Sequence, residues 1–402
     1  MRITYILTQD LESPGGLGRY WPLAREMARL GHKVAIIALH SNYQSLEQKR
    51  FMREGVDIWY VAPMHVRKYE NVKSYYSTPK LIWVVLRATF ALCWAALFTP
   101  ADIVHIGKPQ PMNSIAGLLT KYLRRNKLLL DCDDIEEESG HFTSLWQKKT
   151  ISFFERKTPL GVDLVTTHST AISRRLIKFG VREEKIYFLF NGFDSLRFRP
   201  PTPESLEEMR LKFGLFGKKV VAYIGTLGKS GHAVDLLLNA FVNVKEAIPN
   251  SVLMLVGGGE DFELLKHQSQ VLGIDDRVIF TGRVKPNDVV LYYYLADVTV
   301  DPVKDEEAAR GRLPLKMFES WGCGVPFVTC DIGDRRTWIG RSEAGLLALP
   351  GSAESLAGMI INVLTDPKMA DCLRENGLER VKSFDWQNLA IQMEKQYKAL
   401  IG

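Results

Sequence analysis

The segment Arg199-Pro200-Pro201-Thr202-Pro203 divides the chain into two series of short apolar stretches. Because proline cannot continue a helix or a central strand, this cluster predicts a domain boundary near residues 198–215. We therefore expect an N-terminal domain over residues 1–198 and a second domain over residues 199–382. A closing C-terminal helix is expected over residues 383–402.

Runs rich in β-branched residues alternate with helical patterns on both sides of this cluster, which is typical of parallel sheets covered by helices on both faces. The sequence predicts an α/β fold with one such sheet in each domain. In open parallel sheets ligands bind beyond the carboxyl ends of the strands, so two facing sheets would bind a ligand in a cleft between the domains. Strands are expected at residues 3–7, 33–39, 56–61, 103–106, 127–130, 164–167 and 185–189, then at 220–224, 252–256, 278–281, 298–300, 327–329 and 346–348.

The composition is that of a folded chain, since the 402 residues are 46% hydrophobic and 24% charged. The formal net charge of +6 is spread along the sequence, which argues against a nucleic-acid partner. The cysteines are odd in number and form no CxxC pair, which argues against a disulfide framework or a zinc site. Residues 1–10 resemble a first strand more than a signal peptide. We expect a cytoplasmic protein.

Residues 81–98 form the one long apolar stretch. Arg87 stands near its middle, and an arginine at a bilayer centre costs roughly 3 kcal/mol on insertion scales, so a buried or interfacial helix is favoured over a membrane span. Aromatic side chains at helical spacing are more often core than surface, and we expect core packing here. Peripheral contact with the inner face of a membrane stays open as the alternative. The rings concerned are Trp83, Phe90, Trp94 and Phe98.

A glycine-rich loop follows the first strand, in the order Pro14-Gly15-Gly16-Leu17-Gly18-Arg19-Tyr20. Glycines allow a backbone to approach a ligand closely, and the helix expected over residues 21–30 would offer free amides to an anion. The spacing is not that of a dinucleotide-binding GxGxxG motif. A simple turn between strand and helix is the alternative.

A group of carboxylates follows the strand expected at residues 127–130. Carboxylates at a strand end favour sugar-hydroxyl binding, acid–base chemistry or a metal. A solvated acidic helix start is the alternative. The group comprises Asp131, Asp133, Asp134, Glu136, Glu137 and Glu138.

Residues 190–200 read Phe-Asn-Gly-Phe-Asp-Ser-Leu-Arg-Phe-Arg-Pro. This string resembles the end of the first domain in the retaining glycosyltransferases of family 4, where Asn-Gly-Val-Asp precedes Phe-x-Pro. Further on, residues 224–231 are similar to the family's diphosphate loop, residues 255–260 and 278–284 to its nucleotide-holding segments, and residues 313–328 to its donor-site helix. The similarity runs from the Gly15-Gly16 loop to a helix near Phe384-Asp385-Trp386.

The resemblance implies the GT-B fold, in which two facing Rossmann-like domains enclose a cleft. It implies transfer of a sugar, with retained configuration, from a nucleoside diphosphate sugar to a hydroxyl of a glycan or lipid-linked acceptor. No metal or other cofactor is expected. The donor-binding residues expected are Gly225, Lys229, Glu260, Arg283, Val284, Arg312, Leu313, Pro314, Leu315, Lys316 and Glu319, where Glu319 matches the family's ribose-binding glutamate. Catalytic roles are expected for Asp133, Asp134 and Lys316, and an acceptor-side role for Gly15, Gly16, Arg19, Tyr20 and Asp131.

The chain departs from the family pattern at several positions. Gly311 stands where the first of two family glutamates is usual, and Gly107 stands where many members have a histidine. Thr226 and Ser230 replace the usual arginine and lysine of the diphosphate loop. We expect compensation by Lys316, Lys229 and either Arg310 or Arg312.

Two other hypotheses remain. Asp131-Cys132-Asp133 could be the metal-binding Asp-x-Asp of a single-sheet glycosyltransferase that requires manganese or magnesium, although the second α/β series then has no role. A non-catalytic protein that binds a nucleotide sugar or a glycan is the other.

Overall fold

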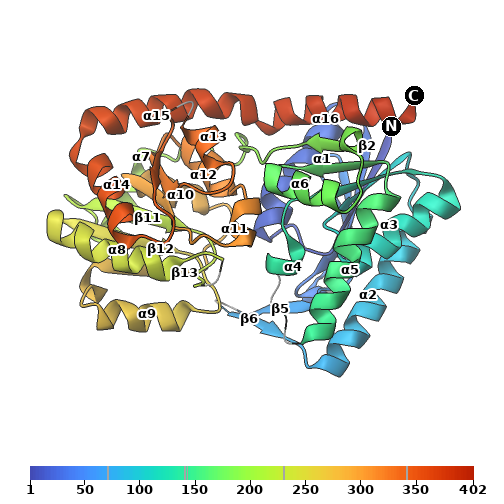
Figure 1. Cartoon of the computed structure of the whole chain (residues 1–402), viewed down its shortest axis with the longest axis horizontal. Helices are drawn as coiled ribbons and strands as arrows, with labels where there is room; N and C mark the ends of the chain where they lie inside the picture. The colour runs from blue at the N-terminus through green and yellow to red at the C-terminus, as the bar shows by residue number, and fades with distance from the viewer. Residues whose placement is uncertain (70–71, 140–141, 143, 230, 341–342) are drawn as a thin grey trace. The chain divides into compact units, whose positions relative to one another are not determined.

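The computed structural model describes residues 1–402 except 70–71, 140–141, 143, 230 and 341–342 (Figure 1). The chain forms two compact units. Unit 1 comprises Met1–Lys68, Ser74–Asn191 and Trp386–Gly402, and unit 2 comprises Tyr69–Lys73 and Gly192–Asp385. The division therefore falls before the proline cluster, whose last residue begins α7 (Pro203–Lys212), and the closing helix α16 (Trp386–Ile401) is part of unit 1.

Unit 1 is built on an eight-stranded sheet in the order β10-β9-β8-β7-β1-β2-β4-β3. All adjacent strands run parallel except β3 and β4, which form an antiparallel hairpin; β3 was not predicted. The short pair β5 (Val66–Tyr69) and β6 (Val72–Tyr75) was also not predicted. The sheet strands are β1 (Arg2–Leu7), β2 (Lys33–His40), β3 (Arg50–Arg53), β4 (Val56–Pro63), β7 (Ile103–Gly107), β8 (Lys127–Cys132), β9 (Leu164–Thr167) and β10 (Ile186–Phe188).

Helices cover both faces of this sheet, as the continuous apolar strands predict. In β1, Tyr5 packs with α1 and α16, whereas the adjacent Ile6 packs with α2 and α3, because successive strand residues point to opposite faces. The helices of unit 1 are α1 (Trp21–Arg29), α2 (Thr78–Phe98), α3 (Pro111–Arg124), α4 (Glu136–Ser139), α5 (Leu145–Gly161), α6 (Thr170–Lys178) and α16.

Unit 2 is built on a six-stranded parallel sheet in the order β13-β12-β11-β14-β15-β16. Every strand predicted after the proline cluster is present, so the α/β fold class is confirmed. The strands are β11 (Lys219–Ile224), β12 (Ser251–Val256), β13 (Val278–Gly282), β14 (Val298–Asp301), β15 (Phe327–Cys330) and β16 (Leu346–Ala348). The remaining helices are α8 (Val234–Ala247), α9 (Phe262–Val271), α10 (Val289–Leu295), α11 (Glu307–Gly311), α12 (Leu315–Gly322), α13 (Arg335–Ile339), α14 (Ala353–Thr365) and α15 (Pro367–Val381).

Helix α2 differs from the expectation of a core helix. It has 21 residues, and an 18-residue window of it has a mean hydropathy of 2.0 and is only 28% buried, so by length and composition it could cross a membrane. The side that packs on the sheet carries aliphatic residues such as Val84, Ala88 and Leu92. The prediction that the aromatic rings lie in the core is wrong, since Trp83, Phe90, Trp94 and Phe98 are each more than half exposed.

Candidate functional site

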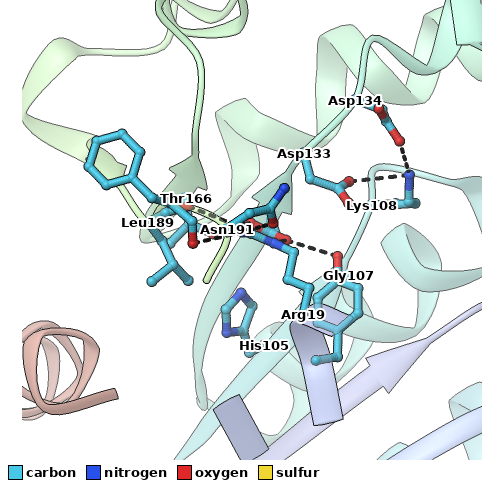
Figure 2. A network of polar contacts seen from close by, with 12 residues as sticks. Arg19, His105, Gly107, Lys108, Asp133, Asp134, Thr166, Leu189 and Asn191 are labelled. Atoms are coloured by element: carbon cyan, nitrogen blue, oxygen red, sulfur yellow. Dashed lines mark hydrogen bonds and ion pairs between the residues drawn. The ribbon is translucent and has the colours of Figure 1, made fainter. Parts of the chain in front are cut away.

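A buried ion pair lies at the carboxyl end of β8 in unit 1 (Figure 2). The π-helical turn Gly16–Tyr20 carries Arg19, whose Nε and Nη2 donate to the two oxygens of Asp131 at 2.6 and 2.7 Å. Asp131 also accepts from Thr166 Oγ1 at 2.6 Å, and Arg19 Nη1 donates to Asn191 Oδ1 at 2.9 Å. Both charged side chains are 1% exposed. Asp131 is therefore fully occupied by protein donors.

Tyr20 completes this network, and its ring accounts for the absence of a side chain at position 107. The Tyr20 hydroxyl donates to Asp131 Oδ2 at 2.9 Å, which places its ring directly over the end of β7. A Cβ at Gly107 would lie 2.7 Å from Tyr20 Cζ and 2.8 Å from Leu7 Cδ2. The ring thus fills the space that a side chain at position 107 would need, and a histidine does not fit there in this arrangement.

A second group in unit 1 centres on Lys108, the residue after β7 (Figure 2). Lys108 has a left-handed backbone with φ of 66°, which turns its side chain towards the carboxylates that follow β8. Its Nζ lies 3.2 Å from Asp133 Oδ1, 2.6 Å from Asp134 Oδ2 and 2.9 Å from Glu136 Oε1. These three carboxylates are close enough together to hold a metal ion, but the ammonium group already supplies a cation among them.

The two aspartates of this edge have opposite pKa shifts. Burial alone would raise the pKa of Asp131, but the charge and hydrogen bonds of Arg19 outweigh it and hold that pKa well below its ordinary value. Burial raises the pKa of Asp133 to about 7, because Lys108 only partly offsets it and Asp134 and Asp131 add negative charge. Asp133 Oδ1 makes no hydrogen bond among the described residues, despite its nearness to Lys108. Asp133 is thus the carboxyl group of this edge best able to exchange a proton near neutral pH.

Two buried histidines, His105 and His168, lie near the ion pair of Arg19 and Asp131. His105 on β7 is fully buried, and its Nδ1 lies 2.7 Å from the Tyr397 hydroxyl of α16, which in turn lies 3.1 Å from the Tyr5 hydroxyl. His168 follows β9 and is 2% exposed, and its Nδ1 has no hydrogen-bond partner among the described residues. Burial lowers the pKa of each histidine to about 4, so both are neutral at pH 7.

The predicted acceptor-side residues are therefore brought together, but Arg19, Tyr20 and Asp131 bond to one another. Their side chains hold the loops at this edge of the sheet together, and their role in binding an acceptor stays a prediction. Gly16 packs its Cα against the backbone of Asp10, where a Cβ would clash, and Gly15 lies beside Gln9. The Asp-x-Asp metal hypothesis is not favoured, because the Asp131 carboxylate accepts from Arg19, Tyr20 and Thr166. Lys108 and His168 were missed, although His168 directly follows a predicted strand and Lys108 lies two residues after one.

Unit 2 carries a cluster of cations around Asp301, the last residue of β14. Lys316 Nζ on α12 lies 3.0 Å from Asp301 Oδ1, and Arg335 Nη2 lies 3.1 Å from Asp301 Oδ2. Lys316 also lies 3.9 Å from the centre of the Tyr223 ring. Burial alone would raise the pKa of Asp301, but the two cations lower it to about 2. Asp301 and Arg335 were not predicted, although an aspartate that ends a strand was a usable signal.

The predicted diphosphate loop, residues 224–231, lies against this cluster. A Cβ on Gly225 would lie 3.2 Å from Lys316 Nζ, and Arg312 Nη1 donates to the Gly231 carbonyl. Arg310 is exposed and pairs with Asp305 at 2.8 Å, so Arg312 is the arginine of the two that contacts the loop. Ser230 lies outside the described residues.

Glu319 lies one helical turn after Lys316 on the same side of α12. Its Oε2 accepts from the Tyr293 hydroxyl at 2.6 Å, and its Oε1 lies 3.7 Å from Arg197 Nη1. Arg197 belongs to the string at residues 190–200 and was not singled out from the sequence. Glu319 is only 14% exposed in its side chain, which does not fit a simple surface carboxylate.

The other predicted donor-binding residues lie at loops of unit 2. The Lys229 amide donates to Asp261 Oδ2 at 2.7 Å, while Glu260 and Arg283 have exposed side chains beyond β12 and β13. Leu313 and Pro314 are buried directly before α12, with Leu315 as its first residue and Val284 after β13. Gly311 ends α11 and is buried, so the family's first carboxylate has no counterpart at this position. The donor-binding assignments stay predictions.

Comparison with known proteins gives one family match for each unit. Residues 14–197 match Glycosyltransferase Family 4, and residues 207–380 match Glycosyl transferases group 1. A GDP-mannose-dependent alpha-(1-6)-phosphatidylinositol monomannoside mannosyltransferase of Mycobacterium tuberculosis is 26% identical over 237 residues, which are 58% of this chain and 61% of that protein. The chain thus aligns with less than two thirds of the length of this relative.

Solved structures resemble the whole chain at low sequence identity. Sucrose-phosphate synthase from Thermosynechococcus elongatus superposes with a TM-score of 0.77 at 20% identity, over 100% of this chain and 99% of that one. Anabaena HepE in complex with UDP-glucose superposes with a TM-score of 0.74 at 18% identity, over 99% and 100%. These two neighbours share the fold, and the two family matches cover both units. The chain is a member of the family 4 and group 1 glycosyltransferases, with their two-domain GT-B fold.

Proposed function

We propose that this protein transfers a sugar from a nucleoside diphosphate sugar to a hydroxyl group of an acceptor, with retention of the anomeric configuration. The observation that carries the proposal is the cluster in unit 2, where Lys316, Arg335 and Arg312 gather around the carboxylate of Asp301 beside a glycine-rich loop. Several cations at the end of parallel strands suit a diphosphate, because charge-assisted hydrogen bonds to phosphate oxygens are strong. A relative named as GDP-mannose-dependent and a neighbour bound to UDP-glucose support this donor class.

Unit 2 is proposed to hold the donor. Glu319 accepts hydrogen bonds from the ribose hydroxyls, since the contact of its Oε1 with Arg197 is long, at 3.7 Å, and a carboxylate oxygen can take further donors. Lys316 and Arg312 contact the phosphates from opposite ends of the loop at residues 224–231. Backbone groups of residues 255–260 and 278–284 hold the base.

In the transfer step, the bond between the anomeric carbon and the β-phosphate oxygen breaks while the acceptor oxygen bonds to the same face of that carbon. The departing phosphate oxygen takes the proton of the acceptor hydroxyl. Lys316 and Arg312 stabilise the charge that develops on the diphosphate, and orientation of the two reactants supplies much of the remaining rate. This step needs no metal ion, because cations of the chain neutralise the leaving group.

Unit 1 is proposed to hold the acceptor, a glycan or lipid-linked molecule. Asp133, whose pKa is raised to about 7 by burial, exchanges a hydrogen bond with the acceptor hydroxyl, and Asp134 with Lys108 fixes its orientation. The cysteines Cys93, Cys132, Cys323, Cys330 and Cys372 are all unpaired, which supports a reducing, cytoplasmic location.

The test is calorimetry and turnover with a panel of nucleoside diphosphate sugars, each measured with and without a chelator. The Lys316→Met variant is expected to lose nucleotide affinity about tenfold or more, as removal of a charge-assisted contact predicts. Lys368→Met, which changes an exposed lysine of the same unit, is the matched control. Unchanged affinity in Lys316→Met would remove the basis of the proposal, and loss of turnover in chelator would refute metal-free transfer.

A non-catalytic protein that binds nucleotide sugars is the second candidate. It is favoured by the buried Gly311 and by Gly107, where Tyr20 occupies the space of the family's histidine. Such a protein would bind the donor with the same dependence on Lys316 but would release no free nucleotide from it. Turnover of any donor, including slow hydrolysis, rejects this candidate.

A further inference from the structure

We propose that unit 1 docks on an anionic lipid bilayer through the exposed side of α2, with the helix lying flat in the interface. We call this surface the aromatic face of α2, and it consists of Ile82, Trp83, Leu86, Phe90, Trp94 and Phe98. The inference does not depend on the proposed transfer reaction, because it concerns residues other than those of the charged clusters described above.

The aromatic face is large and continuous. Its residues recur every three or four positions along the helix, so they form one stripe. The rings of Phe90 and Trp94 have centres 6.4 Å apart, and those of Trp94 and Phe98 lie 4.5 Å apart. A soluble protein rarely exposes so many large apolar side chains together unless they contact a partner. Tryptophan and phenylalanine are the side chains enriched where a helix lies in a lipid interface.

The charges around the aromatic face select an anionic partner. Helices α2 and α3 lie side by side and carry no acidic residue (Figure 1). Between residues 76 and 130 the one acid is Asp102, which pairs with Arg2. Arg124 at the end of α3 donates to the Leu97 carbonyl, so its positive charge lies at the C-terminal end of the stripe. The other exposed cations of this segment are Lys80, Arg87, Arg125 and Lys127. Basic residues next to interfacial aromatics suit acidic phospholipids.

The packing of α2 against the fold favours a flat orientation of the helix in the bilayer interface over a transmembrane one. Val84, Ala88, Leu92, Ala95 and Ala96 are buried against the fold, so a transmembrane orientation would expose this core face to lipid and dismantle that packing. Arg87 near the middle adds a further cost to a span. A second copy of the chain is a poorer occupant of the face, because two such surfaces would bring like charges together. A flat helix keeps the fold intact and immerses only the rings.

The experiment is flotation of the full chain with vesicles of pure phosphatidylcholine and with vesicles of phosphatidylcholine and phosphatidylglycerol in equal parts. The wild type is expected to float with the mixed vesicles. The variant Trp83→Ser/Phe90→Ser/Trp94→Ser is expected to bind at least about tenfold more weakly, because three apolar anchors are lost. The variant Arg87→Glu/Arg125→Glu is expected to lose the preference for the anionic vesicles. The control Leu211→Ser/Phe216→Ser/Val271→Ser removes equally exposed apolar side chains of unit 2 and should bind as the wild type does.

Several results would overturn the inference. Absence of the wild type from the floating fraction would do so, as would equal binding of the aromatic variant and the control. Equal binding to the two vesicle types would refute the role of the basic residues. If sedimentation without lipid gives a dimer that the aromatic variant dissociates, and the wild type does not float, the face is an interface between copies instead. Circular dichroism of each variant checks that the fold is retained.

Discussion

Substitution of Gly107 by alanine tests how tightly Tyr20 is held over the end of β7. The added Cβ would lie 2.7 Å from Tyr20 Cζ and 2.8 Å from its hydroxyl oxygen, whereas ordinary contact starts at 3.4 Å. The ring must therefore retreat by roughly 0.7 Å if the backbone stays in place. Overpacking of this size costs about 1–3 kcal/mol, and strain on the 2.9 Å hydrogen bond to Asp131 adds about 1 kcal/mol.

We therefore expect Gly107→Ala to lower the free energy of unfolding of unit 1 by about 2–4 kcal/mol. Urea denaturation and hydrogen exchange of the β7 and β8 amides measure this loss. In a Tyr20→Ala background the same substitution should cost much less, because the ring is gone and only the contact with Leu7 remains. Gly358→Ala is the control, since Gly358 lies within α14 with nothing close to its would-be Cβ, and it should be neutral or stabilising.

A Gly107→Ala variant as stable as the wild type would contradict the predicted clash, since the ring would then have free room. An equal loss of stability with and without Tyr20 would also contradict it, because the clash would then lie elsewhere. A retained hydrogen exchange pattern in β8 together with lower stability would mean that Asp131 is not disturbed through Tyr20.

The other predictions concern the charged groups of both units. The pKa of Asp133 is raised to about 7 in the folded protein, so the stability that its protonated form contributes is complete below about pH 4 and is lost as the pH rises through 7. Between these pH values the wild type should lose stability relative to Asp133→Asn by about 1.4 kcal/mol per pH unit. Urea unfolding at several pH values measures this, and a stability difference that does not change with pH would contradict it. Lys108→Met leaves three carboxylates without their cation, so it should lower the free energy of unfolding by about 3–5 kcal/mol at pH 7. The loss should be smaller at pH 5, where protonation relieves the repulsion between the carboxylates. An equal loss of stability at both pH values would argue against a charge effect. Glu319→Gln should weaken binding of a nucleoside diphosphate but not of inorganic pyrophosphate, whereas Lys316→Met should weaken both, and calorimetry that gives the same pattern for the two variants would refute their separate roles.

The sequence was sufficient to predict the buried strands of both sheets, but not the edge strand β3 or the exposed face of α2. Buried parallel strands consist of continuous apolar runs, so their positions could be predicted in both units. The strand Arg50–Arg53 was missed because it is polar and pairs at an edge, where apolar patterning is weak. The rings of α2 were misassigned because helical spacing defines a face but does not say which face is buried.

The candidate sites show the same limit at the level of side chains. The motifs located Asp131, Asp133 and Lys316, but a sequence does not reveal which partner each charge finds. The pairing of Asp131 with Arg19 joins residues far apart in the chain, and Lys108 contacts the carboxylates from a left-handed backbone position that the sequence does not predict. Such partners follow from the strand order β9-β8-β7-β1, which brings four loop ends together at one edge of the sheet.

The two charged clusters lie in equivalent places, each beyond the carboxyl ends of parallel strands, yet their charges are opposite. In unit 1, Arg19 and Lys108 face the carboxylates of Asp131, Asp133, Asp134 and Glu136. In unit 2, Lys316, Arg312 and Arg335 lie around the single carboxylate of Asp301 in the cluster as the described residues form it. A diphosphate would be repelled by the first cluster and attracted by the second, whereas a neutral hydroxyl can donate to the carboxylates of the first. Removal of the negative charge by Asp301→Asn should therefore strengthen pyrophosphate binding if folding is retained. Weaker binding would mean that Asp301 positions Lys316 rather than merely offsetting its charge.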